Sequence, residues 1–193
     1  MARIERGSLL SLEAYARERL AFRARVIEHK KRRTVHVGDH VTLIFEDELT
    51  VRYQIQEMLR VERIFEEDGI RHELEAYNPL VPDGGNLKAT MMIEYPDAAE
   101  RQRALARLKG IEDRTWVQAA GGGRIYAIAD EDLERENEEK TSAVHFLRFE
   151  LDAPARAALR RGAALAIGID HPQYQASVEA PPPVRDALAA DLS

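Results

Sequence analysis

Four polar residues could carry chemistry, and two of them fall where the sequence pattern turns side chains toward apolar neighbours. Period-two alternation puts His145 on the same side of an expected strand as four apolar residues. Glu62 falls on the apolar side of an expected helix, where a carboxylate is costly unless it is paired or bound to a metal. Imidazole and carboxylate are common transition-metal ligands, so the sequence suggests a two-histidine, one-carboxylate site of His145, His40 and either Glu57 or Glu62.

A structural interpretation of the same residues competes with the metal site. A histidine on an apolar face is usually a hydrogen-bonded core residue, and Glu62 has Arg60 and Arg63 close by in the sequence for an ion pair. These residues show no spacing motif that would select one interpretation. Both therefore stay open, and a transition metal is the candidate cofactor.

A row of long hydrogen-bond donors follows the other face of the same helix. Arg52, Gln56, Arg60 and Arg63 recur at helical spacing. Such a row suits a carboxylate-rich partner, or an internal lattice of ion pairs with Glu48, Glu66 and Glu67. In an enzyme, Arg60 or Arg148 would hold an anionic substrate.

Familiar enzymatic fingerprints are missing from the sequence. It has no Gly-x-Ser-x-Gly, no His-Glu-x-x-His and no Glu-x-x-His, and its glycine-rich stretches lack the spacing of a dinucleotide loop or a P-loop. It also has no cysteine, which excludes disulfides, thiolate zinc sites and cysteine ligation of an iron–sulfur cluster within this chain.

Length and charge limit the class of protein further. The 193 residues fit a single domain over 1–193, and the net charge of −6 argues against a dedicated nucleic-acid binder. The basic run at 30–33 is interpreted as a solvated helix end. Neither a secretory signal nor a run of apolar residues long enough to cross a membrane is recognisable, so we expect no membrane association and a cytoplasmic protein.

The elements that must position these residues are of both kinds. Capping residues and helical periodicity predict an N-terminal helical layer, and β-branched runs bounded by glycine and proline predict strands. We therefore expect an α+β fold: a mainly antiparallel sheet with helices packed on one side and an N-terminal helical layer. Exposed sheet edges would allow a homodimer. The expected helices are 12–31, 49–67, 69–77, 96–108, 130–140, 154–161 and a short one after 183; the expected strands are 34–45 as a hairpin, 88–95, 115–119, 124–129, 142–151, 164–170 and 175–179.

Three long blocks, at 45–60, 77–94 and 136–150, resemble a bacterial family of unknown function, number thirty-five-oh-one. The resemblance covers essentially the whole chain and implies no reaction. It does imply a context, because relatives are encoded near rubrerythrin-like di-iron proteins and iron–sulfur oxidoreductases. The blocks contain the candidate binding residues, which we take to be Arg52, Gln56, Arg60, Lys88 and Arg148.

Two functions follow as hypotheses. The first is an accessory or binding protein of a bacterial redox or oxidative-stress system, without chemistry of its own, that contacts a rubrerythrin-like or iron–sulfur partner. The second is a metal-dependent enzyme that uses the His/carboxylate site on an anionic small molecule. Convergence of the candidate ligands in space would favour the second.

Overall fold

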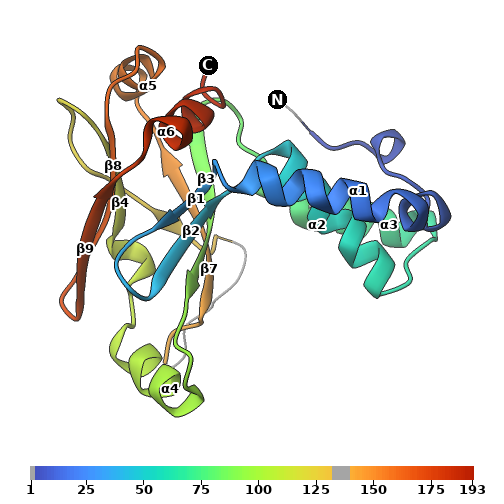
Figure 1. Ribbon diagram of the computed structural model, residues 1–193, viewed down its shortest axis with the longest axis horizontal. Coiled ribbons are helices and arrows are strands. Elements are labelled where there is room, and N and C mark those ends of the chain that lie inside the picture. The colour runs from blue at the N-terminus through green and yellow to red at the C-terminus, as the bar shows by residue number, and fades with distance from the viewer. Residues whose placement is uncertain (1–2, 132–139) are drawn as a thin grey trace.

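A layer of three helices stands beside two antiparallel β-sheets, as Figure 1 shows. The computed structural model describes residues 3–131 and 140–193. The α+β class and the N-terminal helical layer expected from the sequence are confirmed. The acidic segment for which we expected a helix, 130–140, lies mostly outside the described residues.

The helical layer has its own caps and its own apolar core. Ser11 caps α1, and Asp47 with Thr50 forms a capping box at the start of α2. The helices are α1 (Leu12–Lys30), α2 (Glu48–Val61) and α3 (Glu67–Tyr77). Buried apolar side chains of α2, α3 and the segments that flank the helices form a cluster separate from that of the sheets: Ile4, Leu9, Val51, Ile55, Leu59, Ile70, Leu74 and Val81.

The first sheet has five strands in the order β1-β2-β3-β7-β6, and each neighbouring pair is antiparallel. Burial alternates along β7, so His145, Leu147 and Phe149 point inward, as the sequence predicted. Met91 is the register partner of His145 on the next strand. The strands are β1 (Thr34–His36), β2 (Val41–Phe45), β3 (Asn86–Ile93), β6 (Ile128–Ala129) and β7 (Val144–Glu150).

The second sheet has four strands in the order β5-β4-β8-β9, and its inner face shares one hydrophobic cluster with the first. The Thr115 hydroxyl donates to Met91 Sδ across the two sheets at 3.7 Å. Residues 125–129 join the sheets, since β5 pairs with β4 and β6 pairs with β7. The strands are β4 (Thr115–Ala119), β5 (Ile125–Tyr126), β8 (Leu165–His171) and β9 (Tyr174–Glu179).

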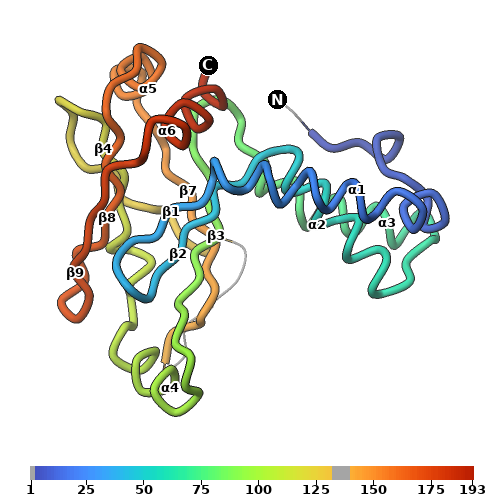
Figure 2. Tube along the Cα trace, viewed as in Figure 1, coloured from blue at the N-terminus to red at the C-terminus, as the bar shows by residue number. Residues whose placement is uncertain are grey.

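The remaining helices close the two ends of the sheets (Figure 1). Leu105 of α4 and Leu108 enter the shared cluster at one end, and Leu159 of α5 and Leu188 of α6 enter it at the other. The Ser193 amide donates to the Gly84 carbonyl at 2.9 Å, so the C-terminus lies beside the turn before β3 (Figure 2). The elements are α4 (Ala98–Arg107), α5 (Ala153–Arg160), α6 (Pro182–Ala189) and the 3-10 helices η1 (Arg6–Ser8), η2 (Asn78–Leu80) and η3 (Glu112–Arg114).

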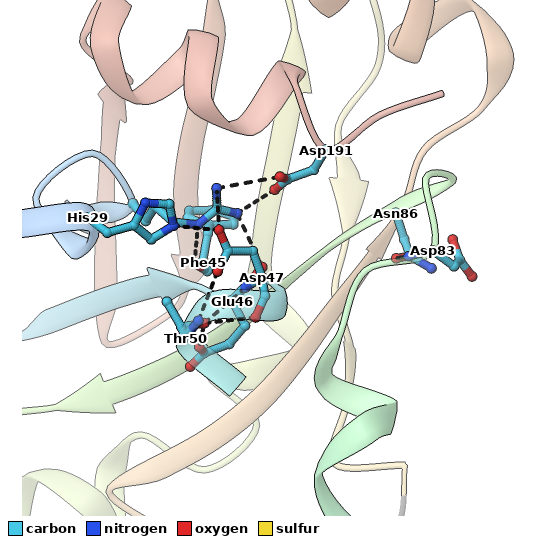
Figure 3. A network of polar contacts seen from close by, with 9 residues as sticks. His29, Phe45, Glu46, Asp47, Thr50, Asp83, Asn86 and Asp191 are labelled. Carbon is cyan, nitrogen blue, oxygen red and sulfur yellow. Dashed lines mark hydrogen bonds and ion pairs between the residues drawn. The ribbon is translucent and has the colours of Figure 1, made fainter. Parts of the chain in front are cut away.

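A buried arginine joins the helical layer to the sheets. Arg33 Nε donates to the Phe45 carbonyl at 2.8 Å, and its Nη atoms reach the carboxylates of Asp47 and Asp191 (Figure 3). Asp47 also bonds His29 Nε2 at 2.5 Å. Arg33 is 2% exposed, so the interpretation of residues 30–33 as a solvated helix end is wrong at this position. The polar network ties the ends of α1, β2 and α6 to the start of α2.

The end of α2 differs from the sequence prediction. The helix stops at Val61, not near residue 67, because Glu62 is its C-cap and Arg63 adopts a left-handed backbone conformation with φ of 54°. Glu62 is therefore exposed, and Phe65, which helical spacing placed on the buried side, is 70% exposed. The prediction that Glu62 is a buried carboxylate is wrong for this reason.

Candidate functional site

His145 is the centre of a buried polar cluster between the two sheets. Its side chain is fully buried on the inner face of β7. Nδ1 lies 2.5 Å from Asp130 Oδ2, and Nε2 lies 2.9 Å from the Thr141 hydroxyl and 3.0 Å from the Ser142 carbonyl. The imidazole is thus held by oxygen atoms on both sides.

Asp130 reaches this cluster from the edge strand of the five-stranded sheet. It follows β6 and adopts φ of 45°, a left-handed conformation that aspartate tolerates better than most residues. Its Oδ1 accepts from the Phe146 amide at 2.8 Å, while Oδ2 faces His145. One carboxylate therefore fixes both the backbone of β7 and the orientation of the imidazole.

Glu112 completes the cluster from η3. Its Oε2 lies 3.8 Å from His145 Nε2, and the residue is 8% exposed. Among the described residues, Glu112, Asp130 and His145 are the group of metal-ligand types whose ligand atoms all lie within 4.8 Å of one another. A histidine and two carboxylates that converge in this way are typical ligands of a transition-metal ion, and this convergence makes the cluster a candidate site.

A cleft of about 600 Å³ lies between the helical layer and β6–β7, and Asp130 lines it. Met58, Leu80 and Phe146 contribute apolar surface. The remaining lining residues are Glu73, Glu75, Ala76, Tyr77, Pro79 and Glu131. The cleft is therefore lined by apolar side chains together with four carboxylates, one of which also orients His145.

Ion pairs beside the cleft hold its sheet wall. Arg148 bonds both carboxylate oxygens of Glu131 at 2.8 Å and also pairs with Glu150. These contacts, chiefly the one with Glu131, raise the pKa of Arg148 above its usual value. Lys88 Nζ donates to the Pro79 and Val81 carbonyls at 2.6 and 3.1 Å, and burial lowers the pKa of Lys88.

The candidate binding residues from the sequence fall into separate places. Gln56 is buried and exchanges hydrogen bonds with the backbone of Leu10, at 2.7 Å from the Leu10 amide and 3.3 Å to its carbonyl. Arg52 pairs with Glu48, and Arg60 pairs with Glu57 at 3.2 Å. The Arg52–Glu48 pair is one that the ion-pair interpretation expected, whereas Arg60 uses Glu57 and Gln56 uses the backbone. Binding of a ligand by these residues stays a prediction.

The candidate metal ligands from the sequence do not converge. His40 stacks on Tyr95 with ring centroids 3.9 Å apart, and its Nδ1 lies 3.0 Å from the Glu94 carbonyl. Glu57 accepts from Tyr15 and from Arg19, each at 2.7 Å, and the hydrogen bonds from Arg19 lower its pKa to about 2. With Glu62 exposed, His145 alone of the predicted set lies in the His–carboxylate cluster.

Glu112 and Asp130 are the partners that sequence reasoning missed. Glu112 lies in a single 3-10 turn and Asp130 in a left-handed position after a two-residue strand, so neither follows a helical or strand period. One signal in the sequence could have pointed to Asp130. It directly follows the apolar pair Ile128-Ala129, and residues just after a strand often carry functional side chains.

Together these features define a two-sheet α+β protein with a helical layer, a carboxylate-lined cleft and a buried His–carboxylate cluster. The chain belongs to the family described as "Protein of unknown function (DUF3501)", which it matches over residues 3–192. It is similar to a crystal structure of a novel protein of unknown function from Burkholderia pseudomallei K96243, with 57% identity, a TM-score of 0.95 and all of both chains covered. Among curated proteins no significant match is found. Within the described residues no helix has the length and apolar character needed to cross a membrane.

Proposed function

We propose that the protein is an accessory protein of a bacterial redox or oxidative-stress system that binds a partner protein through the carboxylate-lined cleft and performs no reaction itself. The observation that carries the proposal is the cleft: its volume of about 600 Å³ suits a few inserted side chains of a partner. This volume lies within the roughly 300–1,000 Å³ typical of ligand clefts.

The lining indicates the chemistry of the partner segment. Met58, Leu80 and Phe146 offer apolar contact, while Glu73 and Glu75 place negative charge at the helical wall. Charge complementarity favours a segment that carries lysine or arginine beside apolar side chains. The partner surface we expect is therefore basic and amphipathic.

The redox context comes from the family resemblance and from the composition of the chain. The resemblance implies that relatives are encoded near rubrerythrin-like and iron–sulfur proteins, and this chain has no cysteine that could ligate an iron–sulfur cluster. An iron–sulfur cluster ligated by cysteine would accordingly belong to the partner. The protein would act by binding that partner.

The test is a binding titration with purified rubrerythrin-like and iron–sulfur proteins encoded beside the gene, each in its oxidised and reduced form. Calorimetry at low and high salt should show a complex with one of them, weaker at high salt. The double variant Glu73→Lys, Glu75→Lys should bind roughly tenfold more weakly or worse, which corresponds to about 1.4 kcal/mol.

Glu13→Lys, Glu28→Lys is the matched control, because it changes the net charge equally on exposed positions of α1. The control variant should bind within twofold of the unmodified protein. Absence of binding to either partner in both redox forms, or equal weakening by the two double variants, would overturn the proposal.

A further inference from the structure

The hydrogen bond at Nδ1 determines which nitrogen of His145 is available to a further ligand. Nδ1 and Asp130 Oδ2 are 2.5 Å apart, too close for both to bind one ion at the roughly 2.0–2.2 Å of nitrogen and carboxylate ligands in a usual geometry. Nδ1 therefore carries a proton that it donates to Asp130. The lone pair of a neutral imidazole is then on Nε2.

Three oxygen atoms surround Nε2. The Thr141 hydroxyl lies at 2.9 Å, the Ser142 carbonyl at 3.0 Å and Glu112 Oε2 at 3.8 Å. Pairs of atoms that bind the same ion at about 2.1 Å lie roughly 3–4 Å apart when the angle at the ion is 90° or more. The separations of 3.0 and 3.8 Å lie in that range, and the one of 2.9 Å lies at its lower edge.

We propose that this protein binds a divalent first-row transition-metal ion at Nε2 of His145 and the carboxylate of Glu112, with the Thr141 hydroxyl and the Ser142 carbonyl as further oxygen ligands. Asp130 is a positioning residue: it fixes the tautomer and the direction of the imidazole, as carboxylates beside metal-bound histidines commonly do. The site is independent of any partner protein.

The donor set selects the class of ion. One imidazole nitrogen with several oxygen atoms and no thiolate suits Mn²⁺ or Fe²⁺, whereas soft ions prefer sulfur ligands. The ion would connect η3 to the start of β7 and so support the sheet wall that carries Asp130 and Phe146.

A histidine held by hydrogen bonds alone is the competing arrangement, in which either the Thr141 hydroxyl donates to Nε2 or a protonated Nε2 donates to the Ser142 carbonyl. The two arrangements differ in what occupies Nε2, and this can be measured on the purified full-length chain. The chain is stripped with EDTA and dialysed against Mn²⁺ or Fe²⁺ without oxygen. Bound metal is then determined by mass spectrometry, and Mn²⁺ affinity by electron paramagnetic resonance.

We expect about one ion per chain, with Glu112→Gln lowering the Mn²⁺ affinity at least tenfold and Asp130→Asn lowering it by about 10- to 100-fold. His40→Gln is the matched control, because His40 lies outside the cluster, and it should bind like the unmodified chain. The melting temperature of each variant without metal shows that it is folded.

His145→Gln should abolish the site, and Glu112→Gln keeps the test decisive if His145→Gln does not fold. Substoichiometric metal in the unmodified chain, or equal affinity in Glu112→Gln and His40→Gln, would show that His145 is a hydrogen-bonded core residue only. Diamagnetic Zn²⁺ can replace Mn²⁺ for ¹⁵N NMR spectroscopy. A spectrum in which both nitrogens of His145 stay protonated in the presence of Zn²⁺ would contradict the proposal independently.

Discussion

Arg33 and His145 are both buried polar side chains, yet their surroundings are opposite in kind. Arg33 is 2% exposed, and its guanidinium faces the carbonyls of Phe45 and Glu46 and two carboxylates. A guanidinium has five N–H donors, so acceptors on every side suit it. His145 has at most two ring donors, yet four oxygen-bearing groups face it.

The difference separates a structural joint from a candidate binding site. Around Arg33, donors and acceptors match in number, and each bond joins two elements of the fold. Around His145, oxygen atoms of Thr141, Ser142 and Glu112 gather at one ring nitrogen, which is the grouping that a cation could join. Burial of a polar group alone does not distinguish the two cases; the arrangement of the atoms around it does.

The largest loss of stability should come from removing Arg33, which joins the helical layer to the sheets. Arg33→Met leaves the carboxylates of Asp47 and Asp191 without their buried partner, and we expect a loss of about 3–5 kcal/mol in the free energy of unfolding. Urea denaturation of the two proteins measures it. Arg17→Met is the control, since the Arg17–Glu13 pair is exposed and should contribute below about 0.5 kcal/mol. Equal losses would mean that the Arg33 network is not a joint.

The loss of stability at low pH should be smaller than the loss caused by Arg33→Met, and it should arise in the helical layer. Hydrogen bonds from Arg19 hold the pKa of Glu57 at about 2, below the ordinary value of 4.5. Because the folded pKa is lowered, the stabilisation is complete above about pH 4.5 and is lost as the pH falls toward 2. After discounting for partial solvent screening, we expect about 1–2 kcal/mol.

Glu57→Gln tests this acid sensitivity through denaturation curves at pH 7 and at pH 3. The variant should be less stable than the unmodified chain at neutral pH, and the difference should shrink as the pH falls. A difference that stays constant between the two pH values would show that the carboxylate charge is not what stabilises the contact between α1 and α2.

Periodicity predicted much of this fold, and it failed where the backbone leaves a regular period. Alternation correctly turned His145 inward, because β7 is a regular strand through that position. Glu112 and Asp130 reach His145 from a 3-10 turn and a left-handed residue, for which no period exists. Arg33 was misread for a related reason: it follows the last turn of α1, and only the arrival of α6 brings Asp191 to it.

The smallest change in stability should come from a substitution of Glu62. Helical spacing predicted that Glu62 is a buried metal ligand, but the structure places it at the exposed C-cap of α2. Glu62→Gln should change the free energy of unfolding by less than about 0.5 kcal/mol, as exposed substitutions usually do. It should also leave Mn²⁺ binding unchanged, whereas the same chemical change at Glu112 should weaken it. Denaturation and metal titration of these two variants compare one carboxylate-to-amide change inside the cluster with one outside it. A larger effect at Glu62 than at Glu112 would mean that the carboxylate selected by sequence period, and not the one selected by spatial convergence, holds the ion.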